Sequence, residues 1–372
     1  MKYRFSFFSR LAALMLSVLI LGVSLISCNQ TPSPDETTAK QPQETTKPVE
    51  KMDLGNMDLT PYIALGQYKN VPVTVDEIEY VVALRQILFE DGAYFEKMSA
   101  DEIDRPVMEG DIIRVDYVGY LNGVEFDGGR ASNQDITVYD GMGYIDGFAT
   151  GFIGAEIGEK SSFKVTFPDK YDVASLAGKE VTFEFKVHYI YQFDEMTDEM
   201  AKDLSAGEYQ TAEAYEQHQR NLVVQEKLWL TIVENATVKK YPEQHLRYYY
   251  QQNRNYYEYY AGAYGLSYEE LLSAFGLKDS DLWDNAELYV LEDLVYYAIR
   301  SEENIFLTDE EYNAKIDIYI KRYKDELKYS DAEIKEHMSE IEDNMLYDKV
   351  QEMLIGWSDV IWVPISEEGA AE

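Results

Sequence analysis

Cysteine and histidine, two residue types often used for nucleophilic catalysis and metal binding, are scarce in this 372-residue chain. The only cysteine, Cys28, lies near the N-terminus, and there are four histidines: His188, His218, His245 and His337. Trypsin-like or papain-like catalysis needs a histidine beside a serine or cysteine, and the lone cysteine is badly placed for that. No histidines have the spacing of metal ligands. The chemistry left open is one that apolar and aromatic side chains can perform, with no metal and no cofactor.

The aromatic side chains gather between residues 109 and 191, where the pattern predicts a sheet. Apolar and polar residues alternate over 113–118, 162–167 and 183–189, as they do in strands with one buried face. Asn122-Gly123 follows the first of these segments and is a strong signal for a hairpin turn. We therefore predict a small, curved antiparallel sheet whose inner face is rich in aromatic rings.

This order of elements resembles the FKBP type of prolyl isomerase domain, and most closely the version found in trigger factor. The resemblance rests on eight short motifs in the family's order, which lie at residues 110–111, 115–119, 122–129, 145–148, 154–159, 165–171, 176–179 and 183. It implies an FKBP-like fold for residues 106–193 and catalysis of cis–trans exchange at X-Pro bonds.

That reaction needs no nucleophile. The barrier to rotation about a peptide bond is about 18–20 kcal/mol, and uncatalysed exchange at proline takes tens to hundreds of seconds. A thousandfold acceleration requires only about 4 kcal/mol. An apolar pocket supplies it by removing the hydrogen bonds of water from the amide and by binding the twisted form more tightly than the planar one.

By the same resemblance, seven residues are expected to line the pocket, namely Tyr117, Phe126, Asp127, Ile145, Phe148, Tyr171 and Phe183. Phe148 is expected to form the floor under the proline ring. The N–H of Ile145 and the hydroxyl of Tyr171 are expected to bind substrate carbonyls. Asp127 is expected to provide the negative charge that favours the twisted amide.

Some of these roles stay open. The rings on the strands would be core residues even in an inactive domain, and Asp127 could be only a turn residue before Gly128-Gly129. Tyr144 is bulkier than the residue usual beside this pocket, and the flap after Tyr171 is short. These departures leave the ligand preference open.

The N-terminal residues 1–27 have the pattern of a lipoprotein signal peptide. Three basic residues precede an apolar run at 11–26 that is short for a membrane span, which needs about 20 apolar residues. Ser27-Cys28 resembles a lipobox, so we expect Cys28 to become the lipid-bearing N-terminus. A plain signal peptide with an incidental thiol is the alternative.

Two segments precede the predicted sheet. Residues 28–56 are rich in proline, threonine and glutamine and lack aromatic residues, which predicts a disordered tether. Residues 57–105 combine short strands with a helix from Asp76 to Glu90 and resemble the end of trigger factor's first domain. The ribosome-docking signature of that domain is absent, and we therefore expect no ribosome contact.

After residue 193 the apolar period becomes that of helices. Thr211, Pro242, Ser267, Thr308 and Ser330 mark helix starts, the last three as capping boxes. We predict five to seven helices.

The predicted fold class is therefore α+β and multidomain. An FKBP-like curved antiparallel sheet with a short helix is followed by an all-α, SurA-like chaperone domain at residues 194–363, which resembles the trigger factor C-terminus at 232–235 and 346–350. Residues 364–372 form an acidic tail.

Nine tyrosines between residues 248 and 268 surround one predicted helix, so they cannot all face one core. They form either an adaptable surface for unfolded chains or a helix packed on two sides, with its hydroxyl groups reaching water.

The formal net charge is −36, which disfavours nucleic acid and anionic lipid headgroups as partners. We expect a peptidyl-prolyl isomerase and chaperone, lipid-anchored at the outer face of the bacterial cytoplasmic membrane. Its partners would be unfolded or partly folded exported polypeptides with X-Pro bonds, and the membrane through the N-terminal lipid. The alternatives are a holdase without isomerase activity and a surface binding lipoprotein that reuses the fold.

Overall fold

The computed structural model describes residues 48–171, 173–325 and 327–365. The predicted signal peptide, Cys28, most of the predicted tether and residues 366–372 lie outside these ranges. The described residues form two compact units, one of residues 73–226 with 360–365 and one of residues 48–72 with 227–359. Within the described ranges, no helix is both long enough and apolar enough to span a bilayer.

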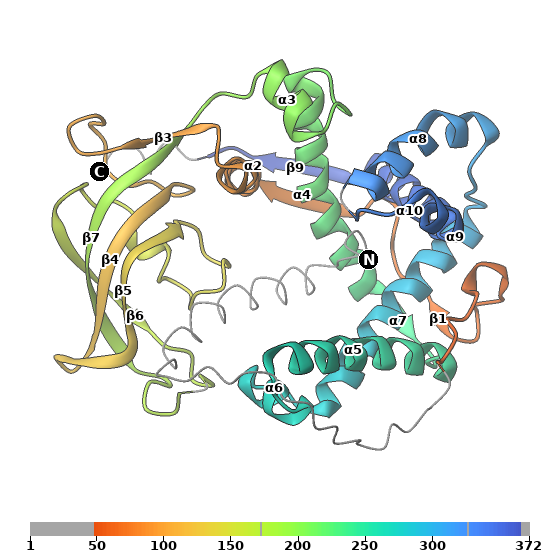
Figure 1. Ribbon diagram of the computed structural model, residues 1–372, viewed down its shortest axis with the longest axis horizontal. Coiled ribbons are helices and arrows are strands. Elements are labelled where there is room, and N and C mark those ends of the chain that lie inside the picture. Colours follow the sequence, from red (N-terminus) through yellow and green to blue (C-terminus); the bar gives the residue numbers. More distant parts are fainter. Residues whose placement is uncertain (1–47, 172, 326, 366–372) are drawn as a thin grey trace, which may run out of the picture. The chain divides into compact units, whose positions relative to one another are not determined.

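The first unit contains a curved five-stranded sheet (Figure 1). Its strands are β3 (Phe95–Met98), β4 (Ile112–Leu121), β5 (Val124–Thr137), β6 (Lys160–Thr166) and β7 (Glu180–Phe193). All neighbours are antiparallel: β4 lies between β5 and β7, while β3 and β6 pair with different parts of β7. The predicted antiparallel sheet is confirmed, with β3 as a strand that the sequence pattern did not reveal.

The hairpin between β4 and β5 forms where it was predicted. Leu121 pairs with Val124, and the two residues between them have positive φ, +52° at Asn122 and +80° at Gly123. Both values suit the tight turn whose twist matches that of the strands. The register shifts after Val115 and again after Val118, and such bulges bend a strand and increase its twist.

The concave side of the sheet carries the core of the unit. Val181, Phe183, Phe185 and Val187 alternate along β7 and are all buried, as a strand with one buried face requires. A single helical turn, η3 (Thr150–Phe152), packs against them with its phenylalanine fully buried. The aromatic inner face predicted from the alternation is therefore present.

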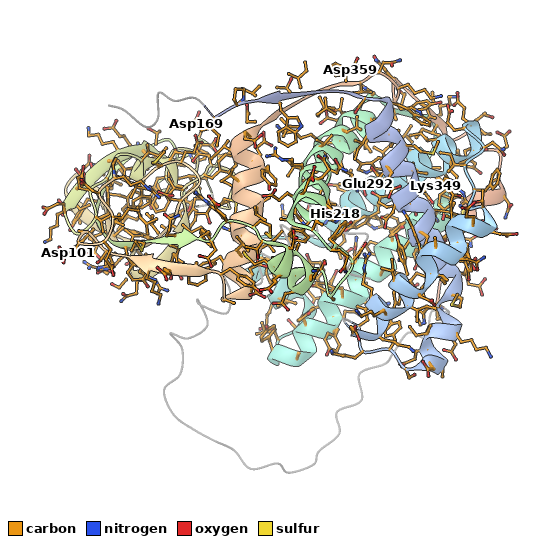
Figure 2. The ribbon with its side chains drawn as sticks, turned by 90° about the horizontal axis from the view of Figure 1, so that it is seen from above. Asp101, Asp169, His218, Glu292, Lys349 and Asp359 are labelled. Atoms are coloured by element: carbon orange, nitrogen blue, oxygen red, sulfur yellow. The ribbon has the colours of Figure 1, made fainter. Side chains whose placement is uncertain are left out.

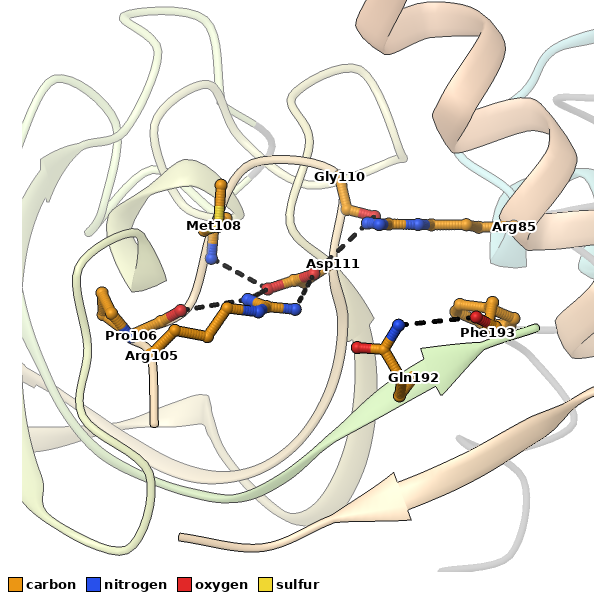
Figure 3. Close-up of polar contacts among 8 residues, drawn as sticks. All are labelled: Arg85, Arg105, Pro106, Met108, Gly110, Asp111, Gln192 and Phe193. Carbon is orange, nitrogen blue, oxygen red and sulfur yellow. Dashed lines mark hydrogen bonds and ion pairs between the residues drawn. The ribbon is translucent and has the colours of Figure 1, made fainter. Parts of the chain in front are cut away.

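Helix α2 (Glu77–Asp91) confirms the helix expected at 76–90. At its start, the N–H of Asp76 donates to the Glu79 carboxylate at 3.1 Å. The guanidinium of Arg85 in this helix donates to the carbonyl of Gly110, at 2.7 Å, and to Asp111, at 3.2 Å, just before β4 (Figure 3). These bonds join α2 to the sheet.

Asp111 is 1% exposed and receives further bonds from Arg105, at 2.6 Å, and from the N–H of Met108, at 2.9 Å. A buried carboxylate is tolerated when it is paired and hydrogen-bonded in this way. A cavity of about 260 Å³ lies beside it and is lined by Ile78, Val81, Arg85, Arg105, Met108, Glu109, Asp111, Gln192 and Ile365. Because both arginines bind Asp111, one of their two positive charges is compensated by this carboxylate.

Residues near the C-terminus also belong to the first unit. Strand β9 (Asp359–Val363; Asp359 is labelled in Figure 2) pairs with β2 (Pro72–Asp76). The all-α description of residues 194–363 therefore does not hold for the last five residues. Helix α3 (Asp198–Leu204) and the first part of α4 (Ala212–Asn235) also belong to this unit.

The second unit is mainly helical. Its helices are α5 (Glu243–Tyr264), α6 (Tyr268–Ala274), α7 (Asp279–Glu302), α8 (Asp309–Asp325), α9 (Asp331–Glu336) and α10 (Met338–Trp357). It also holds η2 (Leu54–Asn56) and a small antiparallel pair of β1 (Ile63–Ala64) with β8 (Thr237–Val238). With α3 and α4, eight helices are described after residue 193, more than the five to seven predicted, because α3, α6 and α9 have only six or seven residues.

The predicted helix starts are found at the expected places. Ser267 accepts from the N–H of Glu270 at 3.2 Å, and Glu270 accepts in return from the N–H of Ser267 at 2.8 Å. Thr308 and Ser330 form the same capping box with Glu311 and Glu333. Pro242 is the residue before α5 and not a first-turn residue.

Residues 48–51, which we call the N-terminal strap, are held on α5 and α7. The N–H of Val49 donates to the side chain of Gln251 at 3.0 Å, and Gln244 donates to the carbonyl of Glu50 at 3.1 Å. Lys51 forms an ion pair with Asp293 at 3.2 Å. The strap is therefore fixed by both backbone and side-chain contacts.

Candidate active site

A tight turn after β5 carries Ile145 and Phe148. The N–H of Phe148 donates to the carbonyl of Ile145 at 3.0 Å. The Asp140 carboxylate accepts from the N–H of Gly147 at 3.1 Å and from the hydroxyl of Thr150 at 3.1 Å. Gly147 has φ of +81°, a conformation that glycine adopts readily. The turn is thus fixed at both ends, and Phe148 points into the sheet's aromatic core.

Four of the predicted rings form one connected cluster. The centroid of Phe148 lies 5.2 Å from that of Tyr117 and 4.8 Å from that of Phe183, both in edge-to-face geometry. Phe126 lies 5.9 Å from Phe183, also edge to face. These separations and angles are the favourable ones for aromatic pairs. Strands β4, β5 and β7 and the turn after β5 therefore bring their rings to one place.

The other three predicted residues lie around this cluster. Ile145 and Tyr171 are half-buried and pack against the same core. Tyr171 reaches it through Phe167, with ring centroids 4.5 Å apart, and Phe167 in turn lies 5.9 Å from Phe126. Asp127 follows Phe126 on β5 and is exposed to solvent. The rings thus form one apolar cluster, and Asp127 is the exposed residue next to Phe126 in the chain.

Two rings that sequence reasoning did not assign to the site, Phe163 and Phe167, also pack on this cluster, and so does Tyr144, which was expected beside the pocket. Phe163 stacks on Phe183 at 5.7 Å, and Phe167 joins Phe126 to Tyr171. The alternation along residues 162–167 places Phe163 and Phe167 on the inner face of the sheet, so the sequence contained a signal for both. Tyr144 stacks on Phe148 with centroids 4.9 Å apart and planes 29° apart, and no periodic pattern indicated this contact.

The two tyrosine hydroxyls nearest Phe148 stay neutral at physiological pH. Burial raises the pKa of Tyr117 to about 12, and the neighbouring Tyr144 adds to the rise. Burial also raises the pKa of Tyr144, with a further contribution from Asp135. The hydroxyl of Tyr117 can therefore act as a hydrogen-bond donor in an apolar setting, which suits the binding of a peptide carbonyl.

Among the described residues, no group of three or more His, Cys, Asp or Glu side chains is placed to hold a metal ion. His188 lies 3.0 Å from Asp116, away from the aromatic cluster. The described site is thus a cluster of aromatic rings in which Phe148 and Phe183 are buried and Tyr117, Phe126, Ile145 and Tyr171 are half-buried. An apolar pocket that opens among such rings can bind an apolar ring and desolvate an adjoining amide.

Some tyrosines of α5 pack against other side chains, and others are exposed to solvent. Tyr250 stacks on Trp283 with centroids 4.3 Å apart, and the hydroxyl of Tyr249 donates to Asp293 at 2.6 Å. Tyr256, Tyr259 and Tyr264 are 42%, 71% and 50% exposed. We call these three the tyrosine face. The packing expected of one interpretation is therefore found for Tyr249 and Tyr250, while a role of the tyrosine face in binding unfolded chains stays a prediction.

Comparison with protein families gives two matches. Residues 104–190 match the FKBP-type peptidyl-prolyl cis-trans isomerase family, and residues 196–356 match the bacterial trigger factor C-terminus. The first range contains all seven predicted site residues. The second begins two residues before helix α3 and ends within α10.

Several curated relatives of the chain are trigger factors. The chain is 31% identical over 306 residues to trigger factor of Caldicellulosiruptor bescii, covering 75% of this chain and 66% of that protein. It is 30% identical to the proteins of Caldicellulosiruptor saccharolyticus and Alkaliphilus oremlandii, covering 76% and 73% of this chain and 66% of each relative. The chain thus spans just under two thirds of the length of these relatives.

Proposed function

Because residues 104–190 belong to the FKBP-type isomerases and residues 196–356 to the trigger factor C-terminal family, we propose that this relative of trigger factor is a peptidyl-prolyl cis-trans isomerase and folding chaperone. The observation that carries the proposal is the cluster of Tyr117, Phe126, Phe148 and Phe183 inside the isomerase-type domain. Its substrates are unfolded or partly folded polypeptides with X-Pro bonds.

The reaction follows from the properties of this surface. A prolyl ring bound among the aromatic rings brings its amide out of water, which weakens the resonance that keeps the bond planar. The hydroxyl of Tyr171 and the N–H of Ile145 bind carbonyls on either side, and the Asp127 carboxylate favours the twisted amide. Only interactions stronger in the twisted form accelerate exchange, and about 4 kcal/mol of them gives a thousandfold effect.

A cis-to-trans peptide assay with the purified full-length chain tests the proposal. Phe148→Ala removes the floor and Asp127→Ala the carboxylate, so each is expected to lower kcat/KM at least about tenfold, a loss of about 1.4 kcal/mol. Asp101→Ala is the matched control, because Asp101 is an exposed aspartate of the same unit (Figure 2). Normal activity in both site variants would show that the site is assigned wrongly.

A second function, holding unfolded chains without isomerisation, is favoured by the tyrosine face. Tyrosine offers a large contact area and a polar tip at low conformational cost, which suits varied partners. Replacing Tyr256, Tyr259 and Tyr264 with serine is expected to weaken suppression of client aggregation while the peptide assay stays unchanged. If Phe148→Ala removes aggregation suppression as well, the two activities share one surface and this separation is wrong.

We also propose that the protein is exported and lipid-anchored at the outer face of the cytoplasmic membrane, without a ribosome partner. The support is sequence alone: the basic and apolar residues before Ser27-Cys28 and the missing ribosome-docking signature. Labelling cells with a radioactive fatty acid is expected to mark the wild-type chain and not Cys28→Ser. Label in both, or co-sedimentation of the chain with ribosomes, would contradict this proposal.

A further inference from the structure

Phe148, the expected floor of the proline site, is not open to a ligand in the structure. Only 4% of the residue is exposed. A proline ring packed on it needs carbon–carbon separations of about 3.5–4.0 Å over a ring face. One of the groups that cover Phe148 must therefore move before a proline ring can pack there.

Five rings of the described residues pack on Phe148, namely Tyr117, Tyr144, Phe152, Phe163 and Phe183. Tyr117, Phe163 and Phe183 lie on β4, β6 and β7, each paired with neighbouring strands. Phe152 lies in η3 and is fully buried. Tyr144 is the member of this set that lies in a loop, and it is the one stacked near-parallel on the ring of Phe148.

The loop that carries Tyr144 contains two glycines that have open space around them. Gly141 and Gly143 have φ of +87° and +86°, and nothing lies within 4 Å of where a Cβ would stand at either residue. Glycine reaches both signs of φ at little cost, so these two positions can act as a hinge. The bonds of Asp140 to Gly147 and Thr150 hold the turn on the other side of Tyr144 in place.

We propose that Tyr144 is a substrate-admitting residue of the isomerase site: its ring covers Phe148 and turns away about Gly141 and Gly143 when a prolyl ring enters. The ring contact with Phe148 is broken on binding and is replaced by the contact with proline. Tyr144 therefore weakens substrate binding without taking part in bond rotation. This inference rests on the proposed isomerase function.

Tyr144→Val removes the covering ring, and Tyr144→Phe keeps the ring and removes only the hydroxyl. An aromatic pair contributes about 0.5–1.5 kcal/mol, which corresponds to about a two- to tenfold change in affinity. With the tetrapeptide Ala-Leu-Pro-Phe as substrate, the full-length Tyr144→Val chain is expected to have a KM lower by this factor and an unchanged kcat. Tyr144→Phe is expected to match the wild type in both.

A second measurement does not depend on how well Tyr144→Val folds. With 4-fluorophenylalanine at position 144, a single fluorine NMR signal reports the ring stacked on Phe148. Saturating Ala-Leu-Pro-Phe is expected to shift this signal toward its position in the urea-unfolded chain, and a proline-free Ala-Leu-Ala-Phe peptide is expected to leave it in place.

The outcomes separate the two proposals. A wild-type chain without isomerase activity and without peptide binding overturns the proposed function and this inference with it. An active wild type in which Tyr144→Val has an equal or higher KM, or in which the fluorine signal stays fixed at saturation, overturns the role of Tyr144 alone. If KM falls as much in Tyr144→Phe as in Tyr144→Val, the effect comes from the hydroxyl. That result would contradict the proposal that the ring of Tyr144 covers Phe148.

Discussion

Gly119 of β4 sets how closely the rings of the isomerase site pack. A Cβ at this position would lie 2.6 Å from the ring of Phe126 and 2.7 Å from that of Phe183, closer than carbon atoms can approach. Gly119→Ala is therefore expected to push these rings apart, to lower the free energy of unfolding by about 1–3 kcal/mol and to reduce kcat/KM. Urea unfolding and the peptide assay measure the two effects.

Gly262→Ala is the control, because nothing lies within 4 Å of a Cβ there and the residue is in helix α5, where alanine is preferred. We expect it to leave kcat/KM unchanged and stability equal or slightly higher. A Gly119→Ala chain as stable and as active as the wild type would mean that the rings yield freely and that close packing does not define the site.

At the level of single residues, the sequence predicted which rings meet but not how they are covered. Tyr117 and Phe183 could be placed because alternation along a strand decides which face a side chain takes. The stacking of Tyr144 on Phe148 could not be predicted. It depends on the backbone angles at Gly141 and Gly143, and glycine leaves those angles open.

Glu311, in the first turn of helix α8, has a carboxylate with several partners. Lys349 of α10 (labelled in Figure 2) lies 2.7 Å from Glu311, and the N–H of Thr308 donates to the same carboxylate at 2.8 Å. These contacts, that of Lys349 first, lower the pKa of Glu311 to about 2. The pKa in the unfolded chain is about 4.3, so the stabilisation is complete above that value and is lost as the pH falls toward 2.

Glu311→Gln is accordingly expected to lower the Tm at pH 6, with the difference from wild type shrinking as the pH falls from about 5 to about 2. Calorimetry at several pH values measures this. The neighbouring exposed Glu310→Gln serves as the control and is expected to follow the wild-type curve. A difference between Glu311→Gln and wild type that stays constant with pH would contradict a role for the charge.

Elements that depend on residues close together in the sequence were predicted well. Elements that depend on pairing with a segment far away in the sequence were not. The capping boxes at Ser267, Thr308 and Ser330 and the Asn122-Gly123 turn depend on residues three or fewer positions apart, so the sequence shows them directly. Strand β9 exists because it pairs with β2, nearly 290 positions earlier by the numbering of the two strands. A local pattern at residues 359–363 carries no information on such a partner.

The strong negative charge of the whole chain is expected to affect how fast the proposed clients, unfolded polypeptides, associate with it. With a formal net charge of −36, long-range attraction favours basic unfolded chains and raises their association rate by about tenfold or more at low salt. The screening length falls to about 10 Å at 0.1 M salt. Stopped-flow association with a basic unfolded client is therefore expected to slow about tenfold between 10 and 300 mM salt.

An acidic unfolded client of equal length is the control, and its association is expected to become somewhat faster with salt because repulsion is screened. Equal rates for both clients at low salt would show that the surface charge has no part in capture and that apolar contacts alone decide it.

The N-terminal strap determines where a pulling force enters the molecule. Any tension transmitted through the chain before residue 48 reaches the bonds of Val49 and Glu50 with α5 and the ion pair of Lys51 with Asp293 on α7. The force then acts on helices α5 and α7. The hydrogen-bonded strands around Phe148 belong to the other unit. Tension applied at the N-terminus therefore acts first on the unit of α5 and α7, and not directly on the strands around Phe148.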